Sequence, residues 1–80
     1  MSFALLDVVV LRSDVTEHGL RAGDLGTIVE VYTPREFEVE FVRPNGMTKA
    51  VVMLRIDQVR AIEPTDMVSV RTAETDSDPG

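Results

Sequence analysis

Cysteine and tryptophan are absent from this 80-residue chain, and histidine occurs once, at His18. Without cysteine there can be no disulfide scaffold, no thiolate metal site and no cysteine nucleophile. The longest apolar runs, 4–6 and 8–11, are too short to cross a bilayer, and the N-terminus lacks the basic region and cleavage site of a signal peptide. We therefore expect a cytoplasmic protein with no membrane segment.

Positive charge is also scarce. The chain has 8 Lys and Arg against 14 Asp and Glu, which gives a net charge of -6. Residues 1–62 are nearly balanced, with nine acids and seven bases, whereas 63–80 hold five acids and one base, Arg71. Because nucleic-acid binding depends on clustered Lys and Arg, we do not expect a nucleic-acid partner.

What the chain does contain is a series of short β-branched or alternating runs, each bounded by turn residues. They predict five strands, with one 3-10 turn (56–59) before the last: 7–12, 25–33, 36–41, 47–55 and 60–62. From residue 65 the composition becomes polar and acidic, which predicts a flexible tail. The fold class is therefore all-β, a small five-stranded barrel over 1–64 followed by an acidic tail over 65–80, in which only 67–71 could pair as an edge strand.

The third predicted strand has the clearest alternation in the chain. Its core face carries Phe37, Val39 and Phe41, and its solvent face carries Glu36, Glu38 and Glu40. Residues 50, 52 and 54 of the next strand are expected to join the core face. This register leaves Lys49 outside, near Glu40, whereas a shift by one residue would bury Lys49.

Glycine and proline mark the predicted turns. Pro44, Asn45 and Gly46 fit a type I turn closed by a left-handed glycine. Gly23 is expected to supply a positive φ before the second strand, and Gly26, just inside that strand, indicates a bulge or a close backbone approach.

The loop 13–19 is polar and leads from the first strand to the second. Ser13 or Asp14 could cap a single helical turn within it, and Gly19 would end that turn.

Five strands with a 3-10 turn before the last are the layout of an SH3-like barrel, and the stretch 23–29 resembles the glycine-centred motif of KOW-type modules. A larger set of residues resembles an uncharacterised bacterial family of stand-alone small domains, number 4926 among the domains of unknown function: 7–11, 19–20, 23–32, 38–41 and Gly46. The resemblance spans about 5–62 and implies a fold only. Such domains often lie beside toxin-like partner genes, so the resemblance also suggests an antitoxin or inhibitor.

The candidate partner-binding residues lie on and around the third strand: Glu36, Glu38, Glu40, Tyr32, Arg35 and Arg43. The three glutamates could compete for a basic site on a partner. The alternative is that they are only the solvated face of an antiparallel strand. They lie too far apart along the strand to converge on a metal, and neither a metal nor a cofactor is expected.

The sequence favours a non-enzymatic module that binds another protein, such as an antitoxin, an immunity-type inhibitor or an accessory subunit. The alternative is a KOW-like nucleic-acid or ribosome-associated module, for which the scattered Arg and Lys residues would have to gather on one face. A hydrolase or nuclease is disfavoured, because one histidine, His18, in a polar loop has no converging partners. Exposed edge strands could also pair two copies in a homodimer.

Overall fold

The structure is a computed structural model that describes residues 2–66. It is mostly β, with five antiparallel strands in one sheet of order β4-β3-β2-β1-β5. The elements are β1 (Val8–Leu11), η1 (Thr16–His18), β2 (Leu25–Thr33), β3 (Glu36–Val42), β4 (Thr48–Arg55), η2 (Ile56–Gln58) and β5 (Val59–Ala61), where η denotes a 3-10 helix. The expected edge strand at 67–71 lies outside the described residues.

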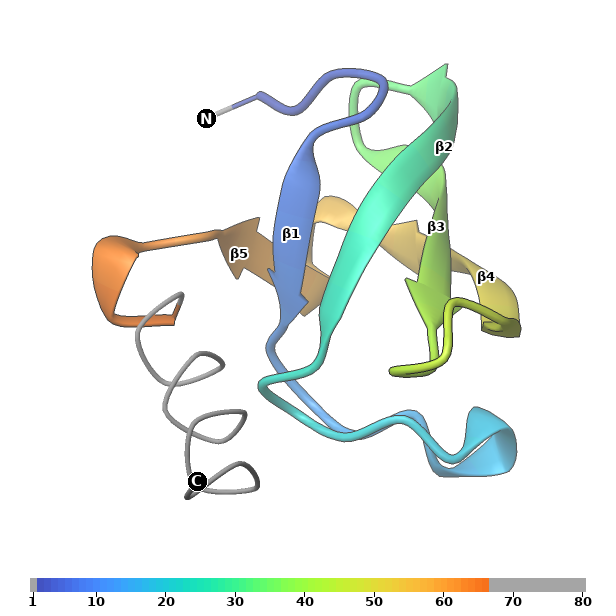
Figure 1. Cartoon of the computed structure of the whole chain (residues 1–80). Helices are drawn as coiled ribbons and strands as arrows, with labels where there is room; N and C mark the ends of the chain where they lie inside the picture. The colour runs from blue at the N-terminus through green and yellow to red at the C-terminus, as the bar shows by residue number, and fades with distance from the viewer. Residues whose placement is uncertain (1, 67–80) are drawn as a thin grey trace.

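The sheet curls but does not close. Figure 1 shows β4 and β5, the two edges, passing behind β1, β2 and β3. Among residues 2–66 these edge strands are not paired with each other, so the sheet is open and the closed barrel expected from the sequence is not confirmed. The helix η2 joins them, and the N–H of Ile56 donates to the carbonyl of Arg35 at 2.8 Å, which ties this junction to the turn between β2 and β3.

Six strand ends differ from the expectation by one residue: both ends of β1 and of β5, the end of β3 and the start of β4. β4 begins at Thr48 because Met47 still belongs to the preceding turn, where its N–H donates to Asn45 Oδ1 at 2.9 Å. β5 begins at Val59 because η2 is three residues long and ends at Gln58.

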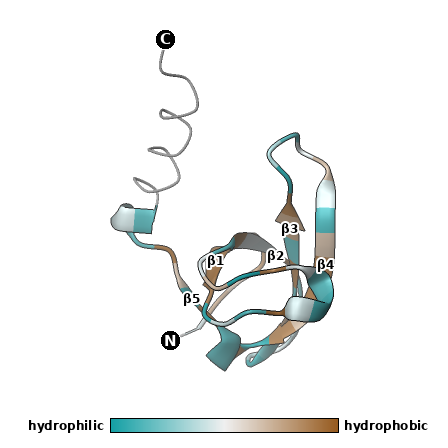
Figure 2. Ribbon diagram, turned by 90° about the horizontal axis from the view of Figure 1, so that it is seen from below, coloured by the Kyte–Doolittle hydropathy of each residue, from teal (hydrophilic) through white to brown (hydrophobic). Residues whose placement is uncertain are grey.

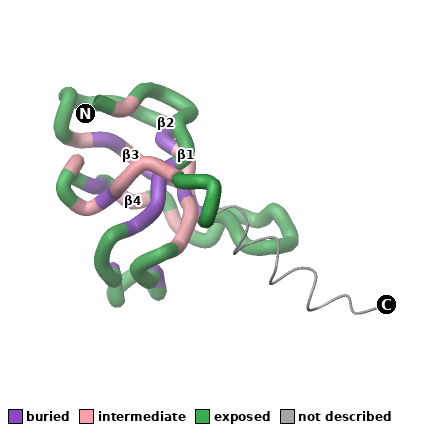
Figure 3. The backbone as a smooth tube through the Cα atoms, turned by 90° about the vertical axis from the view of Figure 1, so that its left-hand side faces the viewer, coloured by how far each residue is buried: buried purple, intermediate pink, exposed green. Residues whose placement is uncertain are grey.

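The core lies on the concave face of the curled sheet. The predicted register is confirmed, since Phe37, Val39 and Phe41 pair with Leu54, Val52 and Ala50 across β3 and β4. Figure 3 shows the buried segments concentrated on the strands and the exposed segments on the turns. The buried cluster comprises Val9, Leu11, Val15, Leu20, Ile28, Phe37, Val39, Phe41, Leu54 and Val59.

The loop that carries η1 closes one end of the core with Val15 and Leu20, whose backbones bond to each other. Seen from below in Figure 2, apolar segments of the strands are interleaved with polar turns and loops. Gly19 ends η1 with a φ of 68°, as expected. The expected cap was wrong, because the residue before the helix is Val15 and Asp14 instead accepts a hydrogen bond from the N–H of Ala22.

Lys49 is exposed, as expected, but its ammonium does not pair with Glu40. A register shift between Phe41 and Val42 separates the two, and Lys49 Nζ donates to the carbonyl of Gly19 at 2.8 Å. Lys49 therefore links the start of β4 to the η1 loop.

Gly26 marks a close approach and not a bulge. It pairs regularly with Val9, while the register shifts of β2 lie further along, between Ile28 and Glu30 and between Val31 and Thr33. A Cβ at Gly26 would lie 2.5 Å from Val39 Cγ1 and 2.8 Å from Phe41 Cε2. Only glycine fits here, because side chains of β3 occupy the space that a larger residue would need.

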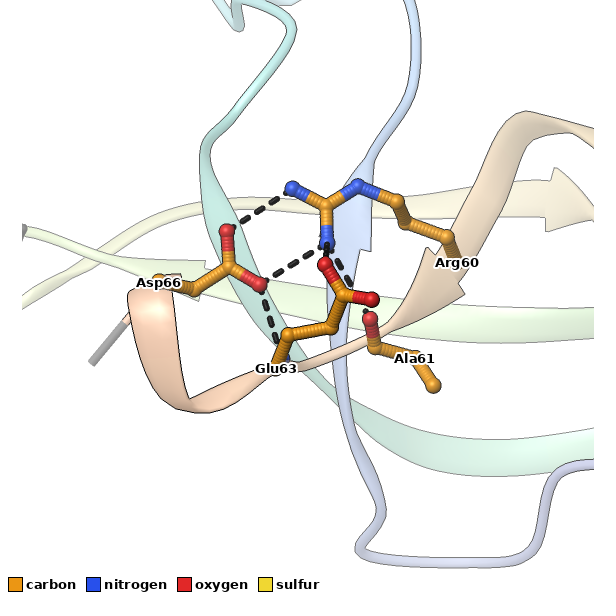
Figure 4. Close-up of polar contacts among 4 residues, drawn as sticks. All are labelled: Arg60, Ala61, Glu63 and Asp66. Carbon is orange, nitrogen blue, oxygen red and sulfur yellow. Dashed lines mark hydrogen bonds and ion pairs between the residues drawn. The ribbon is translucent and has the colours of Figure 1, made fainter.

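The last described residues turn back toward β5, where Asp66 meets Arg60. Asp66 accepts hydrogen bonds at 2.8 Å from both terminal nitrogens of Arg60 and from the N–H of Glu63 (Figure 4). Arg60 is the sheet neighbour of Val10, which is 1% exposed although it stands outside the core cluster. We call the contact of Asp66 with Arg60 and Glu63 the clamp, and it lies beside the buried Val10.

Replacing Gly26 with alanine is expected to lower the free energy of unfolding by about 3 kcal/mol, because the new methyl group overlaps two buried side chains. For a chain of this size the melting temperature should fall by roughly 10 °C or more. Gly23→Asn is the matched control: Gly23 has a φ of 97° with open space around it, and asparagine tolerates this region. Chemical denaturation of both variants measures their free energies of unfolding. A Gly26→Ala variant that is as stable as the wild type would contradict the close approach.

The clamp predicts an acid-dependent loss of stability. The hydrogen bonds from Arg60 and from the N–H of Glu63 lower the pKa of Asp66 from 3.8 to about 2. A lowered folded-state pKa means that the stabilisation is present above pH 3.8 and is lost as the pH falls toward about 2. Asp66→Asn should therefore be less stable than the wild type at neutral pH, with a weaker pH dependence across that window.

Asp57→Asn is the control for this experiment. Its partner Arg55 is 65% exposed and Asp57 is 68% exposed, so their ion pair should contribute little. Urea unfolding followed from neutral to acidic pH gives the comparison. If the free energy of unfolding depends on pH in the same way for Asp66→Asn and Asp57→Asn, the clamp does not stabilise the fold.

Candidate functional site

The candidate site is centred on the outer face of β3. We call Glu36, Glu38 and Glu40 the glutamate stripe. Phe37, Val39 and Phe41 point into the core, so the period of the strand places these three carboxylates on the opposite face, about 7 Å apart. All three are half-buried, which sets them among neighbouring side chains of β2 and β4.

Each carboxylate of the stripe accepts a hydrogen bond from a hydroxyl group. Tyr32 Oη donates to Glu38 Oε1 at 2.8 Å, Thr33 Oγ1 to Glu36 Oε1 at 3.3 Å, and Thr48 Oγ1 to Glu40 Oε2 at 2.7 Å. Hydroxyl donors orient a carboxylate without cancelling its charge. Within residues 2–66 the ion pairs formed by arginine involve other acids, namely Asp57, Glu63 and Asp66, so the stripe forms no ion pair there. Arg55 stands opposite Glu36 across β3 and β4, and Glu38 and Glu40 have apolar residues opposite them in β4.

A fourth glutamate adds to the negative charge. Glu30 of β2 lies directly opposite Glu38, after the register shift that follows Ile28. Two like charges opposite each other destabilise an antiparallel pair. The outer face of β2 and β3 therefore holds a charge arrangement that folding alone does not favour.

The stripe has apolar residues on its β4 side. Val51 pairs with Glu40 and Met53 pairs with Glu38, and these two side chains are 46% and 59% exposed. On the other side, Thr27 pairs with both Glu40 and Val8. One row of the sheet thus runs from Val8 through Glu40 to Val51.

The two arginines predicted as site residues lie at opposite ends of β3. Arg35 sits in the turn before it, where its N–H donates to Thr33 Oγ1 and its side chain lines an open hollow of about 440 Å³ with Arg55 and Asp57. Arg43 opens the turn after β3, where it exchanges backbone hydrogen bonds with Gly46 and Met47. The structure therefore brings Tyr32 together with the stripe, and it separates Arg35 from Arg43.

The predicted turn residues have the expected backbone. Gly23 and Gly46 have φ of 97° and 86°, and Pro44 and Asn45 occupy the turn that Gly46 closes. These positions shape the ends of strands and do not enter the candidate site.

Sequence reasoning missed Glu30 and Thr48 as members of the site. Glu30 shares the parity of the buried Ile28, so a regular strand would turn it inward, and only the register shift brings it opposite Glu38. Thr48 reaches Glu40 because of the shift between Phe41 and Val42. Neither shift has a glycine or proline to mark it in the sequence.

The potential metal ligands of residues 2–66 are scattered. This part of the chain brings no three His, Asp or Glu side chains together in a group that could hold a metal ion. His18 is exposed in η1. Within the same residues, no helix has the length and apolar character needed to cross a membrane.

The chain matches one protein family over residues 5–61, described as "Domain of unknown function (DUF4926)". This match covers most of the chain, and the protein belongs to that family. The family expected from the resemblance is thereby confirmed. No curated protein and no solved structure matches the chain.

The hydrogen bond between Tyr32 and Glu38 can be tested by titrating the phenol. This bond is the main cause that raises the pKa of Tyr32 above its ordinary value, with burial and the charges of Glu38 and Glu30 adding to it. Tyr32 is the only tyrosine and there is no tryptophan, so near-ultraviolet absorbance follows this group alone. Glu38→Gln should lower the pKa of Tyr32 clearly, and Glu30→Gln should lower it less; equal effects would contradict the contact.

Proposed function

We propose that this protein is a non-enzymatic module that binds another protein through the glutamate stripe. The single observation that carries the proposal is that Glu36, Glu38 and Glu40 are oriented by hydroxyl donors and form no ion pair within residues 2–66, although Arg55 stands opposite Glu36. A surface of ordered carboxylates that form no ion pair is complementary to a basic surface, and it speeds and orients the encounter with one.

The alternative explanation is a solvated strand face with no partner. That explanation accounts for polar residues at every second position, but it does not account for Glu30 opposite Glu38. A lysine or threonine at either position would remove the repulsion and keep the alternation. Local conflicts of this kind are typical of functional sites.

The biological role that fits a small acidic binder is that of an antitoxin, an immunity-type inhibitor or an accessory subunit, acting in the cytoplasm without a cofactor. In that role the glutamate stripe would cover a basic surface on the partner. We also propose that the fold is a variant of the SH3-like barrel, because the strand order and the 3-10 helix before the last strand agree with that layout. The open edge between β4 and β5 is where this protein would depart from it.

A KOW-like nucleic-acid module has weaker support. Arg60 is bound by Asp66 and Glu63, Arg55 is paired with Asp57, and Lys49 donates to the carbonyl of Gly19. Three of the seven cations in residues 2–66 are thus engaged within the fold, and Arg35 and Arg43 lie at opposite ends of β3, whereas phosphate binding needs several cations on one face.

The test is affinity capture from cells that express the tagged protein, with partners identified by mass spectrometry. The stripe variant carries Glu36→Gln, Glu38→Gln and Glu40→Gln, which keep the shape and remove three charges. We expect it to lose a partner that the wild type retains at moderate salt. The control variant carries Glu17→Gln, Asp57→Asn and Glu63→Gln at exposed positions and should retain that partner.

Two results would overturn the proposal. One is a wild-type protein that is recovered alone at every salt concentration. The other is a partner that the stripe variant binds as well as the wild type does. Retention of the protein on RNA or heparin at low salt, with loss at high salt, would instead favour the nucleic-acid module.

A further inference from the structure

A strained turn near the N-terminus presents two leucines to solvent. The N–H of Asp7 donates to the carbonyl of Ala4 at 3.0 Å, which closes a four-residue turn with Leu5 and Leu6 at its centre. Leu6 has a φ of 72°, and it is the one non-glycine residue with a positive φ within residues 2–66. A turn with positive φ at its third residue normally has glycine or asparagine there.

The surrounding contacts hold the turn in this conformation. The carboxylate of Asp7 accepts a hydrogen bond from the N–H of Ala4 at 2.8 Å, and the N–H of Leu6 donates to the carbonyl of Ile28 at 2.7 Å. The turn is therefore fixed to β2 and is part of the sheet. A bulky residue in this conformation is held there by its neighbours and is a marker of function.

The leucine side chains contribute little to the core. Leu5 is 57% exposed and Leu6 is 69% exposed. Glycine at position 6 would remove the strain together with the third of the residue that is covered, which lines a hollow with Phe3. The larger part of Leu6 is exposed although the turn disfavours leucine, so it is available for contact with something outside the chain.

The turn is continuous with the glutamate stripe. Leu6 and Val8 line one open hollow of about 560 Å³ together with Phe3 and Ile62. Val8 is 42% exposed and begins the row of the sheet that continues through Thr27 to Glu40. An apolar group and an acidic group thus share one surface.

We infer that Leu5 and Leu6 are the apolar anchor of the interface whose acidic part is the glutamate stripe, and that the partner is a different protein with an apolar cleft rimmed by Arg or Lys. This inference rests on the proposed function. The acidic surroundings, Asp7 beside the turn and Glu40 along the row, select a basic rim on the partner.

A second copy of this chain fits less well. A twofold axis through the turn would bring Asp7 of both copies, and both stripes, toward one another. The exposed apolar side chains of the turn are also only Leu5, Leu6 and Val8, whereas each subunit of a stable dimer contributes roughly 800 Å². A small exposed apolar group beside a charged one is instead typical of an anchor that enters a pocket.

The test uses two synthetic peptides as probes: an amphipathic peptide of leucine and lysine, and an equally charged peptide of serine and lysine. Binding of each is measured by isothermal titration calorimetry at low and moderate salt. We expect the wild-type protein to bind the leucine peptide more tightly than the serine peptide. Leu6→Gly should weaken binding of the leucine peptide about tenfold and leave binding of the serine peptide unchanged.

The melting temperature separates loss of the anchor from loss of the fold. Leu6→Gly should melt close to the wild-type temperature, because relief of the left-handed strain offsets the lost contacts of the leucine and the greater freedom of glycine in the unfolded chain. Met47→Ser is the matched control, because Met47 is 64% exposed in the turn between β3 and β4, and it should change neither binding nor melting.

Each contrary outcome has one interpretation. Equal binding of the leucine peptide by the wild type and by Leu6→Gly overturns the anchor, and the stripe is still supported if Glu38→Gln weakens binding of both peptides. No binding of either peptide at low salt overturns the proposed function and the anchor with it. Concentration-dependent dimers that Leu6→Gly dissolves, seen by analytical ultracentrifugation, would identify a second copy as the occupant and overturn the proposed partner.

Discussion

The architecture depends on the close packing of β3 side chains over Gly26. Val39 and Phe41 occupy the space that a side chain at position 26 would take, so β2 and β3 approach each other and the sheet curls. Curling places β4 and β5 behind the central strands and encloses a core with few residues. A larger residue at position 26 would push β2 and β3 apart and flatten the sheet. The core residues between the strands would then be exposed to solvent.

The same packing determines the outer face. Because Phe37, Val39 and Phe41 all point inward, the residues between them must point outward, and all of those are glutamates. The register shifts of β2 then bring Tyr32, Thr33 and Glu30 within reach of the stripe, while the shift near Val42 brings Thr48 to Glu40. The candidate site is thus a consequence of how the core strand is packed.

Periodicity and turn residues in the sequence were sufficient to predict the central strand pairing and the main turns. Alternation located β3, its core face and its register with β4, and glycine and proline located the turns around Gly23 and Gly46. The sequence did not predict the register shifts, because each inserts a residue without any special side chain. It also could not predict that the sheet remains open, since closure depends on the relative placement of β4 and β5.

Position 6 shows the limit of local reasoning most clearly. A leucine after another leucine predicts neither a turn nor a positive φ, and only the hydrogen bonds from Ala4 and Leu6 to Asp7 and Ile28 impose one.

Two features of the outer face oppose stability, and both are at one surface. Glu30 faces Glu38, and Leu6 adopts a conformation that favours glycine. Either could be relieved by a single substitution that leaves the core untouched, so packing does not explain them. A small domain has little stability to lose. The proposed interface contains both unfavourable choices and would give them one common cause, a partner that covers them.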